Sequence, residues 1–326
     1  MPETLVLLAM TACLARAQQD AVSSPPVHQA LNDAWWTGPL LAPSANTLPP
    51  GHVLIEPYLY DAISEGFYDS TGTRQSAPHV NGFGSLTYIN YGLADRFTVG
   101  LIPVFGYNQA GQGPDSTHID VGDLTVQGQY RLHLFREGGW MPTTSIAVQQ
   151  VIPTGKYDRL GDHPGDGLGG GAYTTTLAFY TQSFFWMPSG RILRARFNAT
   201  QSLSRQVNVQ DVSVYGTSDG FRGHASPGAA LFVDLAGEYS ITRRWVLALD
   251  ATYRHESSTA VRGYNVRNPS HIILLHSGSS QAFALAPAIE YNFNSRVGVI
   301  VGTRLFPAGK NTPNSITPVL AINIVH

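Results

Sequence analysis

The segment Val121–Leu132, VGDLTVQGQYRL, alternates between apolar and polar side chains for longer than an ordinary half-buried strand does. One face of this segment is apolar and ends in an aromatic residue, and the other face is polar. Arg244–Arg254 repeats the pattern, with Trp245, Leu247, Leu249, Ala251 and Tyr253 on one face. Strands of about ten residues with one apolar and one polar face build transmembrane β-barrels. The sequence therefore predicts an all-β fold, a single antiparallel transmembrane β-barrel.

Similar patterns recur along the chain and predict about twelve strands, an even number as single-chain outer-membrane barrels have. The expected strands are Gly51–Ala62, Gly82–Tyr91, Arg96–Tyr107, Ile119–His133, Trp140–Val151, Gly171–Phe184, Arg191–Leu203, Pro227–Tyr239, Arg243–His255, Gln281–Asn292, Arg296–Phe306 and Ser315–Val325.

The connections between these strands alternate strictly between short and long. The short ones are Gly92–Asp95, Leu134–Gly139, Phe185–Gly190, Ser240–Thr242 and Phe293–Ser295. The long polar ones, expected to be loops, are Ile63–Asn81, Asn108–His118, Ile152–Gly170, Ser204–Ser226, Glu256–Ser280 and Pro307–Asn314. Bacterial outer-membrane barrels have short periplasmic turns and longer external loops, so we expect both termini in the periplasm.

Composition supports a membrane barrel and argues against other classes. The 326 residues include 20 basic and 22 acidic ones, a net charge of −2, which does not suit nucleic acid. Charged residues make up only 13% of the chain, and 33 Gly and 21 Pro indicate frequent turns. No apolar run approaches the length of a membrane-spanning helix, so only a barrel could cross a membrane.

The N-terminal segment reads as a secretory signal at residues 1–17, with the apolar core Leu5–Ala12 and the cleavage motif Ala15-Arg16-Ala17. Its basic start is missing, which an incorrectly placed start codon would explain. The only cysteine, Cys13, would be removed, unless the chain is a lipoprotein cleaved before it. The mature chain would then contain no thiol for a disulfide or a metal.

Residues 18–50 form a leader rich in Ala, Pro, Ser and Asn, followed by the barrel at 51–326. The leader holds the pair Trp35-Trp36, which is costly to leave in water. Two interpretations stay open: a loose periplasmic tether, or a plug whose Trp pair docks into the barrel mouth.

Aromatic residues fall on the apolar face near both ends of the expected strands, as the two girdles of a membrane barrel require. Near the short turns these are Phe97, Tyr130, Phe185, Tyr239, Trp245 and Tyr291, and toward the long loops Phe105, Tyr107, Tyr253 and Phe283. Ordinary strand enrichment in aromatic residues is the alternative.

The polar face supplies the residues expected to line the lumen. They are Glu56, Asp123, Gln127, Gln129, Arg131, Arg194, Arg196, Asp234, Glu238, Asp250, Arg254, Glu290 and Arg304. Acids and bases are both present, so neither anion nor cation selectivity is indicated. A web of ion pairs and hydrogen bonds that supports the wall is favoured over a dedicated substrate site.

Catalytic, metal and cofactor motifs are weak, and no catalytic residue, metal site or cofactor is assigned. His255-Glu256-Ser257 faintly suggests a membrane hydrolase, but spacing fixes no partner. Asp162, His163 and Asp166 lie among glycines without the regular ligand spacing of a cation loop, and His271 and His276 have no ligand pattern. Glycine-rich stretches without a following helix do not predict phosphate binding.

Three short motifs carry a resemblance to a known family: Gly122-Asp123-Leu124, Val151-Ile152-Pro153-Thr154-Gly155 and Gly167-Leu168-Gly169-Gly170-Gly171. The chain resembles the outer-membrane β-barrel transporters grouped under the name "MetA-pathway of phenol degradation". The resemblance implies a barrel that passes small hydrophobic or aromatic compounds, with no catalytic residues. Outer-membrane barrels usually end in Phe, whereas this chain ends in His326. The signal to the barrel-assembly machinery would be weakened rather than lost, because that ring still falls on the lipid face.

The expected function is a passive channel in the bacterial outer membrane for small apolar or aromatic solutes. Its expected partners are outer-membrane lipid, those solutes and the barrel-assembly machinery, with no nucleic acid. A structural or interaction barrel with a closed lumen is the alternative, and a membrane-embedded hydrolase is a third interpretation.

Overall fold

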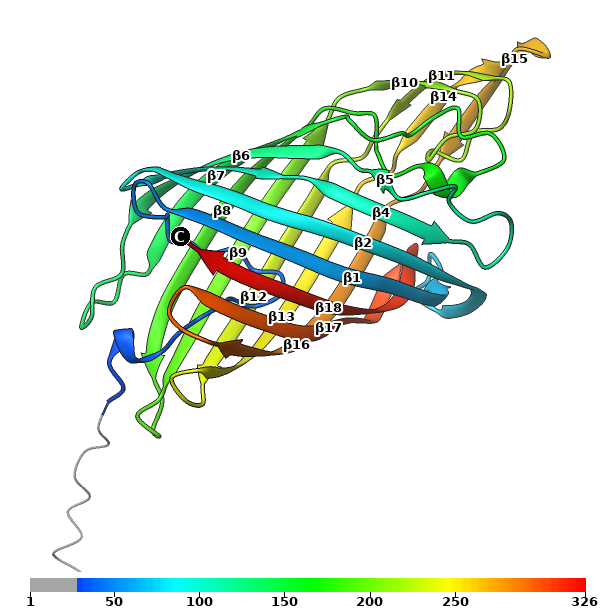
Figure 1. The fold of residues 1–326 in the computed structure, drawn as a ribbon. Coiled ribbons are helices and arrows are strands. Elements are labelled where there is room, and N and C mark those ends of the chain that lie inside the picture. Colours follow the sequence, from blue (N-terminus) through cyan, green and yellow to red (C-terminus); the bar gives the residue numbers. More distant parts are fainter. Residues whose placement is uncertain (1–27) are drawn as a thin grey trace, which may run out of the picture.

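In the computed structural model, which describes residues 28–326, the chain forms a closed antiparallel barrel of twelve strands (Figure 1). Ten of them are continuous: β1 (Val53–Tyr68), β2 (Arg74–Ala94), β7 (Thr143–Ile152), β8 (Thr174–Trp186), β9 (Ile192–Ser204), β12 (Ala230–Ser240), β13 (Trp245–Glu256), β16 (Ser280–Asn292), β17 (Val297–Lys310) and β18 (Thr312–Val325). The other two are interrupted, and consist of β3 (Phe97–Ile102) with β4 (Val104–Gln109), and of β5 (Asp120–Val121) with β6 (Leu124–His133).

The barrel closes because β1 pairs with both β18 and β2, so no strand of the wall keeps a free edge. Pro103 divides β3 from β4, since proline has no N–H to donate to the ladder. The predicted fold class and the twelve strands are confirmed. Among the described residues no helix is long and apolar enough to span a membrane. The helices there are the short 3-10 turns η1 (Leu31–Asp33) and η2 (Pro164–Asp166).

The outer surface of the wall is apolar and the inner surface is polar, as the alternation predicts. Leu249 on β13 is 48% exposed to the outside, whereas its neighbour Asp250 is completely buried inside the barrel. Aromatic side chains pair across neighbouring strands near both ends of the wall. The ring centroids of Trp245 and Tyr291 lie 4.7 Å apart, and those of Tyr253 and Phe283 lie 4.8 Å apart. Such an exposed apolar belt with aromatic ends fits the lipid phase of an outer membrane.

Two of the expected long loops are in fact extensions of the strands. Ile63–Asn81 and Pro307–Asn314 were predicted as polar loops, but β1, β2, β17 and β18 continue through most of both. The β1–β2 hairpin turns tightly because the Asp69 carboxylate accepts hydrogen bonds from the backbone N–H groups of Thr71 and Thr73 at 2.9 and 3.0 Å. The prediction of loops at these two positions was wrong. Strands that extend beyond the lipid phase can still pair with each other, but they need no apolar face and so lack the alternation by which strands were predicted.

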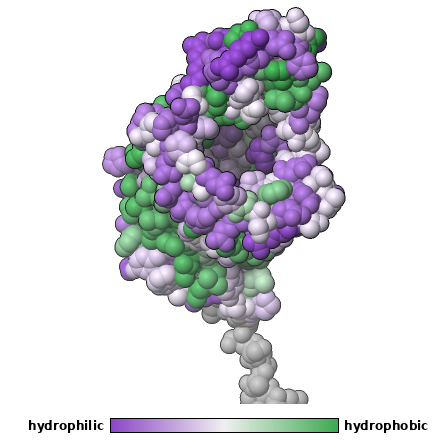
Figure 2. Space-filling view, turned by 90° about the vertical axis from the view of Figure 1, so that its right-hand side faces the viewer, coloured by the Kyte–Doolittle hydropathy of each residue, from purple (hydrophilic) through white to green (hydrophobic). Residues whose placement is uncertain are grey.

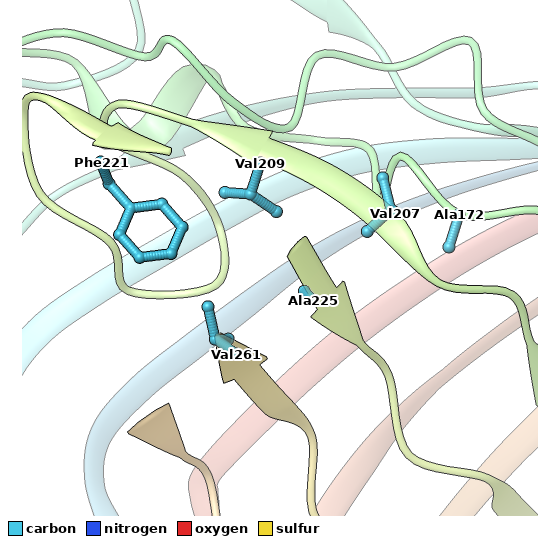
Figure 3. Close-up of a cluster of buried hydrophobic side chains, with 6 residues drawn as sticks. All are labelled: Ala172, Val207, Val209, Phe221, Ala225 and Val261. Atoms are coloured by element: carbon cyan, nitrogen blue, oxygen red, sulfur yellow. The ribbon is translucent and has the colours of Figure 1, made fainter. Parts of the chain in front are cut away.

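The two longest connections are also not loops. Ser204–Ser226 contains β10 (Val207–Gln210) and β11 (Phe221–Ser226), and Glu256–Ser280 contains β14 (Ala260–Asn265) and β15 (Asn268–His276). These strands form a separate four-stranded sheet in the order β10-β11-β14-β15, which projects from the long-loop end of the barrel (Figure 1). Its small core contains Ala172, Val207, Val209, Phe221, Ala225 and Val261 (Figure 3). Only pairing between two distant connections creates this core.

Seen from the long-loop end, the barrel has a hollow mouth surrounded mainly by hydrophilic residues (Figure 2). The predicted signal sequence at residues 1–17, including Cys13, lies outside the described residues, as does the start of the leader.

Candidate functional site in the barrel lumen

The described part of the leader, His28–Pro50, begins at the end of the barrel where the short turns lie (Figure 1, blue). Gln29 holds this end in place. Its backbone N–H donates to the carbonyl oxygen of Gly190 at 2.9 Å, and its side-chain amide donates to Ser240 Oγ at 3.0 Å. Its carbonyl accepts a hydrogen bond from Trp186 Nε1 at 2.8 Å. The leader is thus fixed to the turns that join β8 to β9 and β12 to β13.

The two adjacent tryptophans of the leader are both half-buried against cations of the wall. The guanidinium of Arg243 lies 4.5 Å from the ring centroid of Trp35. The guanidinium of Arg194 lies 4.6 Å from the ring centroid of Trp36, whose other neighbour is Phe184. These cation–π contacts cover the rings without a dedicated apolar pocket.

Beyond the tryptophans, the leader backbone donates hydrogen bonds to two buried carboxylates of the wall. Glu290 Oε2 accepts from the N–H groups of Thr37 at 2.7 Å and Gly38 at 3.3 Å. Asp250 accepts from those of Leu40 at 3.0 Å, Leu41 at 3.3 Å and Ala42 at 3.1 Å. Because the leader here has no secondary structure, these carboxylates satisfy backbone groups that a sheet would otherwise pair.

A buried cluster of charges supports the same contact. Arg194 forms an ion pair with Glu238, and Arg196 Nε lies 3.2 Å from Glu238 Oε2. Arg196 also reaches the leader, donating to the carbonyl oxygen of Ala42 at 2.6 Å. Asp234 is completely buried, and neither of its carboxylate oxygens has a hydrogen-bond partner among the described residues. The predicted lumen charges therefore combine an ion-pair web with a binding surface for the leader.

Apolar contacts fix the innermost part of the leader. Leu40 is buried against apolar and aromatic side chains of the wall, namely those of Tyr58, Ala286, Ile300 and Ala321. On the opposite side Ala45 packs with Ala147, Ala178 and Tyr180, and its carbonyl accepts a hydrogen bond from Ser145 Oγ. The leader therefore spans the lumen from β16–β18 to β7–β8.

The leader then returns to the short-turn end. Gln129 Nε2 donates to the carbonyl oxygen of Ser44 at 3.0 Å, and Arg131 donates to Asn46 Oδ1 at 2.7 Å. The N–H of Leu48 donates to Thr98 Oγ1 at 2.9 Å, shortly before the chain enters β1. Residues 28–50 thus make a U-shaped path inside the barrel, with both arms at one end.

A cavity of about 270 Å³ remains between the leader and the wall. Its aromatic lining consists of Tyr58, Tyr88 and Tyr180. Glu56 and Gln127 also line it, and each is hydrogen-bonded to a neighbour on the wall, Asn323 at 3.1 Å and Asn90 at 2.7 Å respectively. The cavity combines aromatic surface with a few oriented polar groups, as small-molecule sites do.

Three further predicted lumen residues lie away from the leader. Arg254 is exposed at the long-loop end, where it contacts Glu256 at 3.1 Å. The guanidinium of Arg304 lies 4.6 Å from the ring centroid of Phe306. Asp123 lies in the gap between β5 and β6 and holds two loops together. Its carboxylate accepts hydrogen bonds from the N–H groups of Gly155 at 3.0 Å and Gly170 at 2.8 Å.

The junction at Asp123 brings together the three motifs that carry the family resemblance. Thr154 Oγ1 donates to the carbonyl oxygen of Gly122 at 2.8 Å. An added Cβ on Gly155 would lie 2.8 Å from the Cα of Gly169, so glycine is required there. These motifs therefore hold both ends of the long connection Ile152–Gly170 against the wall at the long-loop end of the barrel.

The weak catalytic and metal candidates have structural partners or no site geometry. Asp166 is buried and accepts hydrogen bonds from the N–H and hydroxyl of Thr117 at 2.8 and 3.0 Å. Burial by itself raises the pKa of Asp166. The two hydrogen bonds from Thr117 together lower it by more, so the pKa lies below its ordinary value. His163 contacts the carbonyl oxygen of Asp115, and Nδ1 of His255 has no hydrogen-bond partner among the described residues. Within residues 28–326 no group of three or more His, Cys, Asp or Glu could hold a metal ion.

Comparison with known proteins agrees with this barrel. The family model described as "Putative MetA-pathway of phenol degradation" matches residues 68–315, about three quarters of the chain. The chain belongs to this family. The resemblance predicted from the three motifs is confirmed, and no match among curated proteins was found.

Among solved structures, the chain of this MetA-pathway family member is similar to the COG4313 outer membrane channel from Pseudomonas putida F1. The two are 14% identical with a TM-score of 0.66, over 87% of this chain and 98% of that chain. The transport unit of the autotransporter AIDA-I from Escherichia coli is 11% identical with a TM-score of 0.43, over 87% and 93%. A TodX monoaromatic hydrocarbon channel mutant is 11% identical with a TM-score of 0.40, over 92% and 97%. The chain shares the β-barrel fold of the COG4313 protein, and the predicted location in the outer membrane is confirmed.

Sequence reasoning missed the apolar residues that seat the leader. Leu40 and Ala45 are buried in the lumen, yet they lie in a segment without periodicity. The small residues Ala286 and Ala321 lie within predicted strands, but alanine at these positions gives no sign that a leucine packs against it. The run Gly38-Pro39-Leu40-Leu41-Ala42-Pro43, apolar within a polar leader, was the one available signal.

Proposed function

We propose that the protein is a passive outer-membrane channel for small apolar or aromatic solutes, and that its own leader closes the lumen. The observation that carries the proposal is the seating of the leader backbone on Glu290 and Asp250, two buried carboxylates on the paired strands β16 and β13. The leader is held by hydrogen bonds, by cation–π contacts and by the buried side chains of Leu40 and Ala45. None of these contacts belongs to the strand pairing of the wall, so the leader can be released without unfolding the wall.

The solute class follows from the cavity beside the leader. At about 270 Å³ it lies just below the range for small-molecule sites, about 300–1,000 Å³, so it suits a single small ring. Tyr58, Tyr88 and Tyr180 offer ring faces and edges to such a solute. Gln127 and Asn90 offer polar groups that would suit a hydroxylated ring.

The proposed orientation puts the short turns in the periplasm and the long connections outside. The leader then enters the lumen from the periplasm, and solutes enter through the hollow mouth at the long-loop end (Figure 2). A further cavity, of about 470 Å³, lies between the small sheet and the long-loop end of the barrel, where Tyr215, Val261 and Leu275 provide apolar lining. It would bind a solute before the solute enters the lumen.

A reversible crosslink between leader and wall tests the proposal. Ala45→Cys with Ala147→Cys joins two residues of one buried cluster, and the mature chain would contain no other thiol. We expect low conductance and slow solute flux in the oxidised protein, and recovery of both on reduction. The single variant Ala147→Cys is the control. Deleting Gln18–Leu48 should raise conductance and flux while the barrel stays folded.

A closed structural or interaction barrel is the second candidate, because the leader fills much of the lumen. If the reduced protein and the deletion variant both lack conductance and flux in planar bilayers and vesicles, this candidate replaces the channel.

A further inference from the structure

The four-stranded sheet at the long-loop end has two faces of different character. Paired residues place Val207, Val209, Phe221, Ala225 and Val261 on one face, which is the buried core of Figure 3. We call this the inner face. The opposite face, which we call the outer face, carries Arg222, His224, Arg262, Tyr264, Ile272 and Leu274 at paired positions.

The outer face exposes large apolar side chains. Ile272 is 57% exposed, Leu274 is 60% exposed and Tyr264 is 42% exposed. Tyr264 pairs with Ile272 and Arg262 pairs with Leu274, so these four side chains form one contiguous patch. An apolar patch above the membrane is expected to be covered by something other than water.

The charge of the outer face has one sign. No Asp or Glu occupies an outward position on any of the four strands, within the part of the chain that the structure describes. Arg262 is exposed and forms no ion pair or side-chain hydrogen bond with a described residue. Arg222 contacts Asp211, an acid that follows β10. The patch therefore combines apolar side chains with an unneutralised guanidinium.

The position of the inner face shows which way the outer face points. The inner face packs against Ala172, Tyr157 and Tyr215, and Tyr215 donates to the carbonyl oxygen of Gly170. The N–H of Gly170 in turn donates to Asp123, which lies between β5 and β6 at the long-loop end of the barrel. The inner face therefore lies on the lumen side of the sheet, at the edge of the mouth. The outer face points away from the lumen, toward the side on which the wall meets lipid, as at Leu203 of β9, which is 57% exposed.

We propose that the outer face binds the anionic, phosphorylated glycolipid of the outer leaflet. Guanidinium groups form paired hydrogen bonds with phosphate, and Arg262 is free to do so. Ile272, Leu274 and Tyr264 contact the apolar boundary beneath the headgroups, as in other interfacial surfaces. The small sheet is then held beside the open mouth by lipid as well as by its own core. The proposal rests on the orientation given under the proposed function.

A second copy of the chain is the competing occupant, because β15 lies at the edge of the sheet and its free edge pairs with no strand among residues 28–326. The charge favours lipid. Two copies joined at this face would place like charges of Arg262 and its symmetry mate on one surface without an acid between them.

Binding of lipid A to the full-length protein in detergent, measured by native mass spectrometry, tests the proposal. The probes are diphosphoryl lipid A and the same lipid with both phosphates removed. The variants are Arg262→Gln and the double variant Ile272→Ser with Leu274→Ser. Arg296→Gln, at the short-turn end, is the matched control for the loss of one exposed charge. Heat-dependent migration checks that each variant keeps a folded barrel.

We expect diphosphoryl lipid A to bind, and Arg262→Gln to weaken its affinity about fivefold, the effect of one basic residue near an anionic lipid surface. The double variant should weaken it at least as much, and Arg296→Gln should leave it within about twofold. Equal binding of the phosphate-free lipid, or equal affinity of Arg262→Gln and Arg296→Gln, overturns the proposal. A dimer that the double variant abolishes, without any loss of lipid, assigns the face to a second copy instead. None of these readouts depends on conductance, so the channel proposal can fail while this one stands.

Discussion

Leu40 of the leader packs against β17 where Gly302 leaves room for it. An added Cβ on Gly302 would lie 2.7 Å from Cδ1 of Leu40, closer than side chains approach one another. The wall is therefore shaped to accept the leader, because Ala286, Ile300 and Ala321 complete the same socket. The leader and the wall fit each other as parts of one core.

Leu40→Ala should release the leader while the barrel stays folded. Removing a buried leucine side chain typically costs about 2–5 kcal/mol, and here the loss falls on leader docking. We expect more frequent or larger channel openings in planar bilayers. Leu59→Ala, at an exposed lipid-facing position of β1, is the control and should conduct like the unmodified protein. Identical conductance of the two variants would show that Leu40 does not hold the leader.

Neighbouring substitutions on β13 test the two faces of the wall. Leu249→Arg puts a charge into the lipid phase at a cost of about 2–4 kcal/mol and should impair assembly and heat-resistant migration. Asp250→Asn should leave both intact but weaken the leader, because an amide cannot accept all three N–H groups that Asp250 accepts. Migration on gels and conductance report the two effects separately. Similar behaviour of both variants would contradict the assignment of faces.

Asp123→Ala should loosen the junction that Asp123 forms with Gly155 and Gly170 at the long-loop end of the barrel. It removes two hydrogen bonds to a charged group, each worth about 1.5–3 kcal/mol. We expect faster limited proteolysis within residues 153–170. Asp162→Asn, at an exposed position of the same loop, is the control and should not change the cleavage rate. Unchanged protection in Asp123→Ala would mean that the glycine packing alone holds the loops.

Acid should loosen the small sheet at β10 and β11. The hydrogen bond from Arg222, helped by the charge of Arg159, holds the pKa of Asp211 below its ordinary value of 3.8. A carboxyl with a lowered pKa stabilises the fold above its ordinary pKa and loses this contribution as pH falls through the lowered value. Hydrogen exchange in β10 and β11 should therefore accelerate below about pH 4. Asp211→Asn should remove this pH dependence, and its persistence there would point to another group.

The orientation is tested with tags at opposite ends of the barrel. A tag in the turn Val266–Arg267, between β14 and β15, should be labelled on intact cells. A tag at Phe293–Ser295, in a short turn, should be labelled only after the outer membrane is opened. The reverse pattern would invert the proposed topology.

The wall could be predicted from the sequence because each strand carries its own information. In Trp245–Tyr253 the alternation alone separates the lipid face from the lumen, since successive side chains of a strand point to opposite sides. The alternation of short and long connections predicted that strands consecutive in the sequence pair with each other in antiparallel fashion. For the same reason the family motif at Gly122-Asp123-Leu124 could be recognised without knowing what Asp123 binds.

The sequence by itself thus determined a twelve-stranded membrane barrel and the alternation of apolar and polar faces along strands such as Trp245–Glu256. Only the tertiary structure decided what fills the interior of the barrel. Leu40 reaches its socket through contacts with residues some 250 positions later, and Asp250 binds backbone groups that carry no side-chain signal. The small sheet likewise needs two connections to meet before Val209 and Val261 share a core. Strand periodicity is a local property, whereas the seating of the leader and the pairing of distant connections depend on which surfaces the closed barrel brings together.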